Sequence, residues 1–161
     1  MSVVFCSSEV LPFAKTGGLA DVCSALPLAL ANAGEDVKIV LPFYRCVRQS
    51  GAPLEHAAAG FYRTRLKDRV DVYFVEHEAY FDRPGFYGDS HGDYPDNLKR
   101  FVFFNRQVFR LLKLLGEPID VIHCHDWQTG AIPLLLKFEY AKDRFFEKTR
   151  SVFTIHNLAY Q

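Results

Sequence analysis

A lysine and two consecutive glycines, Lys15-Thr-Gly-Gly18, stand between a short apolar run and an amphipathic helical pattern. This arrangement suits a diphosphate, because glycine lets the backbone approach an anion and the start of a helix offers unpaired N–H donors and a partial positive charge. The ammonium group of Lys15 adds a mobile full charge. The turn differs from both common phosphate signatures, since G-x-G-x-x-G is missing and the P-loop lysine follows its glycines. Taken alone, a Gly-Gly turn before a helix is more often plain turn chemistry.

Two further polar clusters each follow an apolar run of strand type. His125-Asp-Trp127 comes after residues 120–124, and His156-Asn157 comes after residues 151–155. In an open parallel sheet, ligands bind beyond the carboxyl ends of the strands, near the point where the strand order reverses. Three clusters with charged or imidazole groups on one sheet edge, the turn at Lys15 included, therefore predict a binding site there.

The histidines also raise the alternative of a metal site, because His123-Cys-His-Asp126 contains only possible ligands. In a strand the two histidines share a face and Cys124 points the other way, and no further ligand pair stands at a usual interval. We therefore predict no metal site. Trp127 can stack on a sugar ring or pack beside a helix, and His156 can be a hydrogen-bonded structural histidine. A serine hydrolase is disfavoured because no G-x-S-x-G elbow is present.

The elements that must position these clusters begin with a strand, helix, strand succession. Residues 3–6 and 37–41 are apolar runs, and the helical pattern between them ends at Gly34. Such a succession predicts a βαβ unit with parallel pairing. Pro27 predicts a kink or a break in the helix, because it lacks a backbone donor. The expected buried stripe of this helix consists of Leu19, Val22, Leu26, Ala29, Leu30 and Ala33.

The rest of the chain predicts a hairpin, a loop, a long helix and a second strand, helix, strand succession. Residues 61–66 and 70–75 alternate around a polar turn, which indicates a hairpin added to the sheet. Residues 82–96 are rich in Gly, Asp, Pro and Tyr and predict a loop. Asp96 can cap a long helix that Gly116 ends. That helix has its apolar stripe at Phe101, Phe104, Val108, Leu111, Leu112 and Leu115.

A strand over residues 120–124, a helix over 131–142 and a strand over 151–155 complete the pattern. The predicted fold class is therefore α/β, a Rossmann-like parallel sheet with flanking helices and an added β-hairpin.

Composition restricts the partners and the compartment. The chain has 161 residues, 49% of them hydrophobic, and Lys plus Arg equals Asp plus Glu at 19 each. It lacks the basic excess that holds a nucleic-acid backbone, so no nucleic acid is expected. No apolar run approaches about 18 residues and no signal peptide is recognisable, so neither membrane insertion nor secretion is indicated. The four scattered cysteines indicate free thiols in a reducing cytoplasm.

Four motifs together resemble the bacterial glycogen synthases and plant starch synthases, in that family's order and spacing. They are Glu9-Val-Leu-Pro-Phe-Ala-Lys-Thr-Gly-Gly-Leu-Ala-Asp-Val22, Asp93-Tyr-Pro-Asp-Asn97 with Arg100-Phe101, His123-Cys-His-Asp-Trp-Gln-Thr129 and Thr154-Ile-His-Asn-Leu-Ala-Tyr-Gln161. The resemblance runs from end to end. It implies a retaining glucosyltransferase of the two-Rossmann-domain GT-B fold that moves glucose from ADP-glucose to the non-reducing end of an α-1,4-glucan such as glycogen or a maltooligosaccharide.

The resemblance also implies roles for individual residues and no need for a metal or other cofactor. Lys15 would contact the donor phosphates, with the backbone of Gly17 and Gly18 close to the diphosphate and the sugar, and Asp21 would be a polar contact of the donor site. His156 would lie next to the transferred glucose, and Asp126 near the same pocket. Tyr94 and Asn97 match a motif on the acceptor side.

The same resemblance implies an incomplete enzyme. Residues 1–161 correspond to the N-terminal Rossmann-like domain, truncated inside the last motif, and the C-terminal nucleotide-sugar domain is expected to be missing. The chain alone is therefore predicted to be inactive. Two alternatives stay open: a non-catalytic glucan- or sugar-binding fragment that keeps the acceptor side, and a nicotinamide-binding domain. The second is disfavoured because G-x-G-x-x-G and an acidic residue ending the second strand are both missing.

Overall fold

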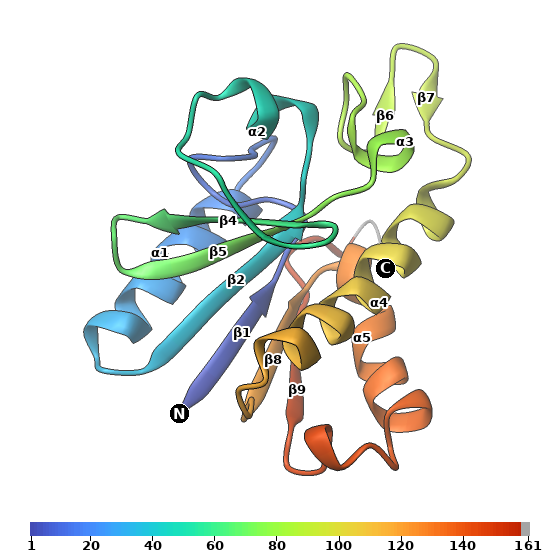
Figure 1. Cartoon of the computed structure of the whole chain (residues 1–161). Helices are drawn as coiled ribbons and strands as arrows, with labels where there is room; N and C mark the ends of the chain where they lie inside the picture. The colour runs from blue at the N-terminus through green and yellow to red at the C-terminus, as the bar shows by residue number, and fades with distance from the viewer. Residues whose placement is uncertain (159–161) are drawn as a thin grey trace.

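A seven-stranded, mostly parallel sheet forms the centre of the computed structural model, which describes residues 1–158 (Figure 1). Strands β1, β2, β5, β8 and β9 pair in parallel, whereas β3, β4 and β5 form an antiparallel meander at one edge. In sheet order the strands are β3 (Glu55–Ala58), β4 (Phe61–Leu66), β5 (Val70–Val75), β2 (Asp36–Pro42), β1 (Ser2–Cys6), β8 (Val121–His125) and β9 (Arg150–Thr154).

Helices cover both faces of this sheet (Figure 1). Helix α1 (Leu19–Asn32) packs on β2 and β5 from one face, and α4 (Asn97–Leu115) packs on the other. Helix α5 (Ala131–Leu134) continues as a π-helical turn, Leu135–Glu139. The predicted fold class is confirmed. The smaller elements are α2 (Arg45–Gln49), α3 (Glu78–Phe81), the hairpin of β6 (Gly88–Asp89) and β7 (Gly92–Asp93), and two 3-10 turns, Trp127–Thr129 and Arg144–Phe146.

The order of the strands creates one topological switch point. From β1 the chain moves outward through β2 to β5, and after α4 it returns to the other side of β1 and continues through β8 to β9. The carboxyl ends of β1 and β8 therefore border a crevice between connections that leave in opposite directions. The three polar clusters predicted to share one edge all follow strands of this region.

Helix α1 differs from the sequence expectation in two respects. The helix continues across Pro27, which is buried, so of the predicted kink or break the break is wrong. Its buried face consists of Leu19, Ala20, Cys23 and Pro27, whereas Val22 and Leu26 are 40% and 36% exposed. The apolar pattern of α1 carries two stripes, and periodicity alone does not say which stripe faces the sheet.

Helix α4 agrees better with its predicted stripe. Phe101, Phe104, Val108, Leu111 and Leu112 are all buried, and Gly116 ends the helix with a positive φ of 70°. Asp96 does occupy the N-cap position, but its side chain makes no capping bond. Both of its carboxylate oxygens accept hydrogen bonds from Arg83, at 2.8 and 2.7 Å.

Two more boundaries differ from the prediction. The hairpin of β4 and β5 gains a third strand, because β3 pairs with β4. The helix expected over 131–142 ends earlier, where the π-helical turn reaches Tyr140. All four cysteines are free thiols: Cys46 is exposed and the other three are buried. Over residues 1–158, none of the helices has the length and apolar character needed to cross a bilayer.

Arg100 ties the loop of residues 82–96 to α4. Its guanidinium is fully buried and donates to the carbonyls of Tyr80 and Phe86 and to Oδ1 of Asn97, at 2.6 to 3.1 Å. Burial lowers the pKa of Arg100 from its ordinary value, yet the carbonyl and ring contacts keep the charge solvated by protein groups. Arg100 is therefore a buried anchor of the loop beside the crevice.

We expect Arg100→Met to reduce the free energy of unfolding by about 2–3 kcal/mol, because hydrogen bonds of a charged donor are lost and buried carbonyls are left unpaired. Urea unfolding followed by circular dichroism measures this. Arg106→Met on the same helix is the matched control, since the exposed pair of Arg106 with Glu139 contributes at most about 1 kcal/mol. Equal losses in the two variants would contradict the anchoring role of Arg100.

Candidate functional site

A cavity of about 590 Å³ lies at the switch point, where β1, β8 and β9 end. All three clusters predicted from the sequence contribute to its wall. Its lining consists of Glu9, Thr16, Gly17, Gly18, Leu19, Val22, Tyr87, Asp93, Asp126, Trp127, Gln128, His156 and Asn157. The cavity is open on one side to solvent and combines carboxylates, an imidazole, aromatic rings and a helix N-terminus.

The turn before α1 is organised around the buried carboxylate of Glu9. Its oxygens accept hydrogen bonds from the backbone N–H of Thr16 at 2.5 Å, the hydroxyl of Thr16 at 2.6 Å and the backbone N–H of Gly17 at 3.1 Å. The hydroxyl of Tyr87 donates to the same carboxylate at 2.7 Å and lies 2.8 Å from the hydroxyl of Ser8. Glu9 is only 3% exposed, so its charge is balanced by these donors rather than by water.

Of the residues predicted to bind the donor, Gly17 and Gly18 line the cavity and Lys15 and Asp21 do not. The N–H of Gly17 is already engaged by Glu9, whereas Gly18 occupies the N-cap of α1, where the first N–H groups have no intrahelical partner. Lys15 and Asp21 do not line the cavity; they form an exposed ion pair at 2.8 Å beside it. Both glycines have room around them, since a Cβ at either position would meet nothing within 4 Å.

Asp126 and His156 are brought together at the end of β8. The carboxylate of Asp126 accepts the backbone N–H of His156 at 2.6 Å, and the N–H of Asp126 donates to the carbonyl of Thr154 at 3.0 Å. Asp126 has φ 57° and ψ −179°, a region that is nearly restricted to glycine and costs about 1–3 kcal/mol. The strained backbone turns this carboxylate toward the segment that carries His156.

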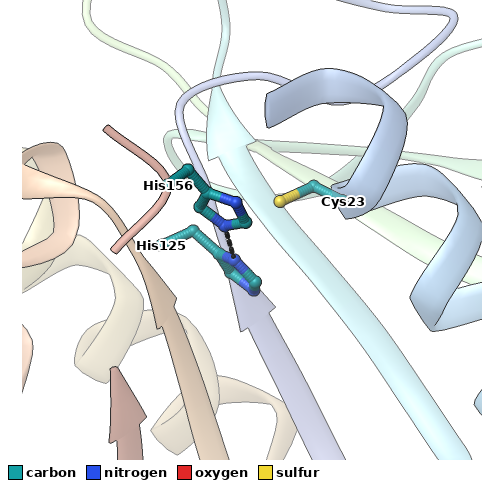
Figure 2. A group of neighbouring side chains, drawn as sticks. All are labelled: Cys23, His125 and His156. Atoms are coloured by element: carbon teal, nitrogen blue, oxygen red, sulfur yellow. Dashed lines mark hydrogen bonds between the residues drawn. The ribbon is translucent and has the colours of Figure 1, made fainter. Parts of the chain in front are cut away.

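His125 contacts His156 through its ring. Nδ1 of His125 lies 2.8 Å from Nε2 of His156, as Figure 2 shows. Burial first, and then the neighbouring His123 and His156, lower the pKa of His125 to about 3. His123 itself lies 2.8 Å from the hydroxyl of Thr154. His123 and His125 therefore lie on one face of β8, as predicted. His123 contacts Thr154 at the end of β9, and His125 contacts His156 just after β9.

Cys23 completes a group of three possible metal ligands that the sequence spacing did not suggest. Its sulfur and the nitrogens of His125 and His156 lie within 4.8 Å of one another (Figure 2). Two nitrogens of a tetrahedral zinc site stand roughly 3.3 Å apart, wider than the 2.8 Å between these imidazoles. Burial also raises the pKa of the Cys23 thiol to about 12, which keeps its proton on. The group fits a shared hydrogen bond better than a metal ion.

Two aromatic side chains, Tyr87 and Trp127, form part of the cavity wall. Trp127 packs edge-on against Phe101, with ring centroids 5.1 Å apart, and lies 6.0 Å from Tyr87. Trp127 therefore both packs against α4 and lines the cavity, so the two predicted roles are compatible. Sequence reasoning missed Tyr87 and Glu9. The signal for Glu9 was a single carboxylate directly after a buried strand, whereas nothing in the sequence of the loop distinguished Tyr87 from its neighbours.

Tyr94 and Asn97, predicted on the acceptor side, do not line the cavity. The hydroxyl of Tyr94 accepts the N–H of Gly85 at 3.3 Å, and the amide of Asn97 donates to the carbonyl of Tyr87 at 2.7 Å. These contacts hold the loop that presents Tyr87. An acceptor-side role for Tyr94 and Asn97 remains a prediction. Because neither residue lines the cavity, they would act on it through the position of the loop that carries Tyr87.

A family model described as the starch synthase catalytic domain matches residues 2–161. The chain belongs to this family. Among curated proteins, glycogen synthase 2 of Geobacter sulfurreducens is 49% identical over 173 residues, covering 100% of the chain and 36% of the relative. A glycogen synthase of Geotalea uraniireducens has the same identity and coverage. The chain thus spans about a third of the length of these starch synthase family members.

The solved structures place the fold in the same family. The catalytic domain of starch synthase IV from Arabidopsis thaliana, bound to ADP and acarbose, is 33% identical with a TM-score of 0.85 and matches 99% of the chain and 34% of that protein. An Escherichia coli protein described as trehalose-6-phosphate bound with UDP-2-fluoro glucose is 12% identical with a TM-score of 0.52, a likeness of fold alone. The predicted relation to the starch and glycogen synthases and to the GT-B fold is confirmed.

Replacing Glu9 by Gln should loosen the turn before α1, because the introduced amide N–H₂ would face the N–H groups of Thr16 and Gly17. Hydrogen bonds to a charged acceptor contribute about 1.5–3 kcal/mol, so amide hydrogen exchange at Thr16 and Gly17 should accelerate roughly ten- to a hundredfold. Glu78→Gln, at an exposed position, is the control. Unchanged protection of both amides in the Glu9 variant would refute this account of the turn.

His125 should make the protein less stable in acid. The unfolded chain binds a proton at this imidazole below about pH 6.5, whereas the folded protein binds it only near pH 3, so stability falls as pH drops through that interval. Between pH 7 and pH 5 this contributes a loss of about 2 kcal/mol.

Urea unfolding at both pH values measures the loss in the natural chain and in His125→Phe, where the drop should be about 2 kcal/mol smaller. His91→Phe, at an exposed position, should behave like the natural chain. An identical pH dependence in all three proteins would contradict the neutral state of His125.

Proposed function

We propose that this chain forms one half of the active site of a retaining glucosyltransferase that transfers glucose from ADP-glucose to the non-reducing end of an α-1,4-glucan. The observation that carries the proposal is the cavity at the switch point, where a helix N-terminus, His156 and Asp126 meet in a member of the starch synthase catalytic domain family. The chain covers 36% of its curated relatives, so we propose that a C-terminal domain completes the site and that residues 1–161 alone are inactive.

The donor diphosphate would lie at the start of α1, close to Gly17 and Gly18. As the glycosidic bond breaks, negative charge develops on the departing phosphate, and cations and helix N-termini lower the barrier by stabilising it. Lys15 is a suitable cation because its exposed pair with Asp21 contributes little and can be exchanged for a phosphate contact. Asp21 would then be a polar neighbour that holds Lys15 between turnovers.

The transferred glucose would lie next to His156, with Asp126 near the same pocket. The family to which the chain belongs implies a front-face reaction in which the departing phosphate helps to deprotonate the acceptor, and we propose that reaction here. We assign no nucleophile among residues 1–158.

The glucan would approach along the aromatic wall formed by Tyr87 and Trp127, whose rings can stack on sugars. Tyr94 and Asn97 would support this side by holding the loop. No metal or other cofactor is needed for these steps. We place the reaction in the cytoplasm, which fits four unpaired thiols.

A non-catalytic glucan-binding fragment is the second candidate, favoured by the same aromatic wall. This candidate predicts that the isolated chain binds maltooligosaccharide in calorimetry without turning over ADP-glucose. Absence of binding would eliminate it.

The decisive experiment concerns Lys15. In the protein at the full length that its gene encodes, Lys15→Ala should lower the rate of glucose transfer from ADP-glucose about ten- to a hundredfold, because a charged contact of this type is worth roughly 1.5–3 kcal/mol. Incorporation of labelled glucose into glycogen measures the rate.

Lys142→Ala, on an exposed loop away from the cavity, is the matched control and should leave the rate unchanged. Equal rates in the Lys15 and Lys142 variants would reject the donor site. A full-length protein with no transfer activity at all would reject the proposed reaction itself.

A further inference from the structure

The hydrogen bond between His125 and His156 contains one proton, and the surroundings of His125 decide which ring donates it. A neutral imidazole has one N–H and one lone pair. Nδ1 of His125 faces Nε2 of His156 at 2.8 Å (Figure 2). Nε2 of His125 is enclosed and has no hydrogen-bond partner among residues 1–158.

The two possible tautomers of His125 differ in what they leave unpaired. A proton on Nε2 would create a buried N–H without an acceptor, and such orphaned donors are rare in folded proteins. A proton on Nδ1 is used in the bond to His156 and leaves only a lone pair at Nε2. The burial that keeps His125 neutral excludes a third state with both nitrogens protonated.

We propose that His125 is a positioning residue that donates its Nδ1–H to Nε2 of His156 and thereby fixes the orientation and the tautomer of that ring. His156 then carries its own proton at Nδ1, on a ring that lines the cavity and has Cys23 beside it. A ligand with a sugar hydroxyl oxygen near this nitrogen would accept that N–H. This last step rests on the proposed function, whereas the tautomer does not.

His125 is well placed to act as a fixed support. Its ring is fully buried and stacks on Phe5 of the central strand, with centroids 5.5 Å apart and planes inclined by 15°. The ring of His123 contacts both, at 4.2 Å from His125 and 4.9 Å from Phe5. His156 is exposed, but its backbone N–H is bound by Asp126, so the imidazole is the part that still needs orienting. Two contacts, one to the backbone and one to the ring, then define its position.

Nuclear magnetic resonance tests the tautomer directly on the 161-residue chain. Long-range proton–nitrogen correlation at pH 7 should show His156 protonated at Nδ1 and unprotonated at Nε2. His125→Phe keeps a ring of similar shape and removes both the donor and the buried unpaired nitrogen, so we expect it to fold. In this variant His156 should shift toward the Nε2–H tautomer that free histidine favours.

Two further variants separate the donor from general packing. His125→Asn places an amide donor near the position of Nδ1 and should retain the Nδ1–H tautomer of His156. His123→Phe removes the neighbouring imidazole and its bond to Thr154, and should leave the tautomer unchanged. A natural chain with His156 protonated at Nε2, or a His125→Phe variant with an unchanged tautomer, would overturn the proposal.

Kinetics of the full-length protein test the consequence. His125→Phe should lower kcat/KM for glucose transfer about tenfold, the effect expected for one misplaced neutral hydrogen bond, and His125→Asn should restore part of it. Unchanged kcat/KM in His125→Phe would reject the positioning role. If the tautomer prediction fails while Lys15→Ala still lowers transfer as predicted, the positioning role is rejected and the proposed function stands.

Discussion

The buried carboxylate of Glu9 is the interaction on which the site depends. Two stretches of chain donate hydrogen bonds to it: the turn at Thr16 and Gly17, which follows in sequence, and Tyr87 of the distant loop of residues 82–96. A carboxylate buried without donors is costly, so the turn and the loop must close around it for the protein to fold. The same contact positions one wall of the cavity and brings a negative charge close to a site that would bind an anion.

The parallel pairing of β8 with β9 has a similar role on the other side of the cavity. Side chains 31 residues apart meet twice along this edge, His123 with Thr154 and His125 with His156. Asp126 adds a third contact and accepts backbone strain to make it. Together these contacts fix the segment after β9 to the end of β8. His123, His125 and Asp126 thus stabilise the fold of this edge, although their side chains are of types that also occur in catalytic sites.

Much of the fold and the location of the site could be predicted from the sequence, but the contacts within the site could not. Alternating strands and helices indicated a parallel sheet, and the common edge of its strands indicated where Gly18, Asp126 and His156 would gather, although Lys15 lies outside the cavity. Periodicity could not choose between the two apolar stripes of α1. Nor could it show that Glu9 binds the N–H of Gly17, because this depends on how the chain returns after the strand.

The internal partners of the site constrain how a nucleotide sugar could enter it. Displacing Glu9 from Thr16 and Gly17 would expose several donors and leave a buried charge uncompensated, which is expensive. Separating Lys15 from Asp21 costs at most about 1 kcal/mol, because both side chains are exposed. A diphosphate is therefore expected at the Lys15 end of the helix N-terminus rather than within the turn itself. From that position the attached sugar would extend toward His156, whose ring is hydrogen-bonded to His125 at the end of β8.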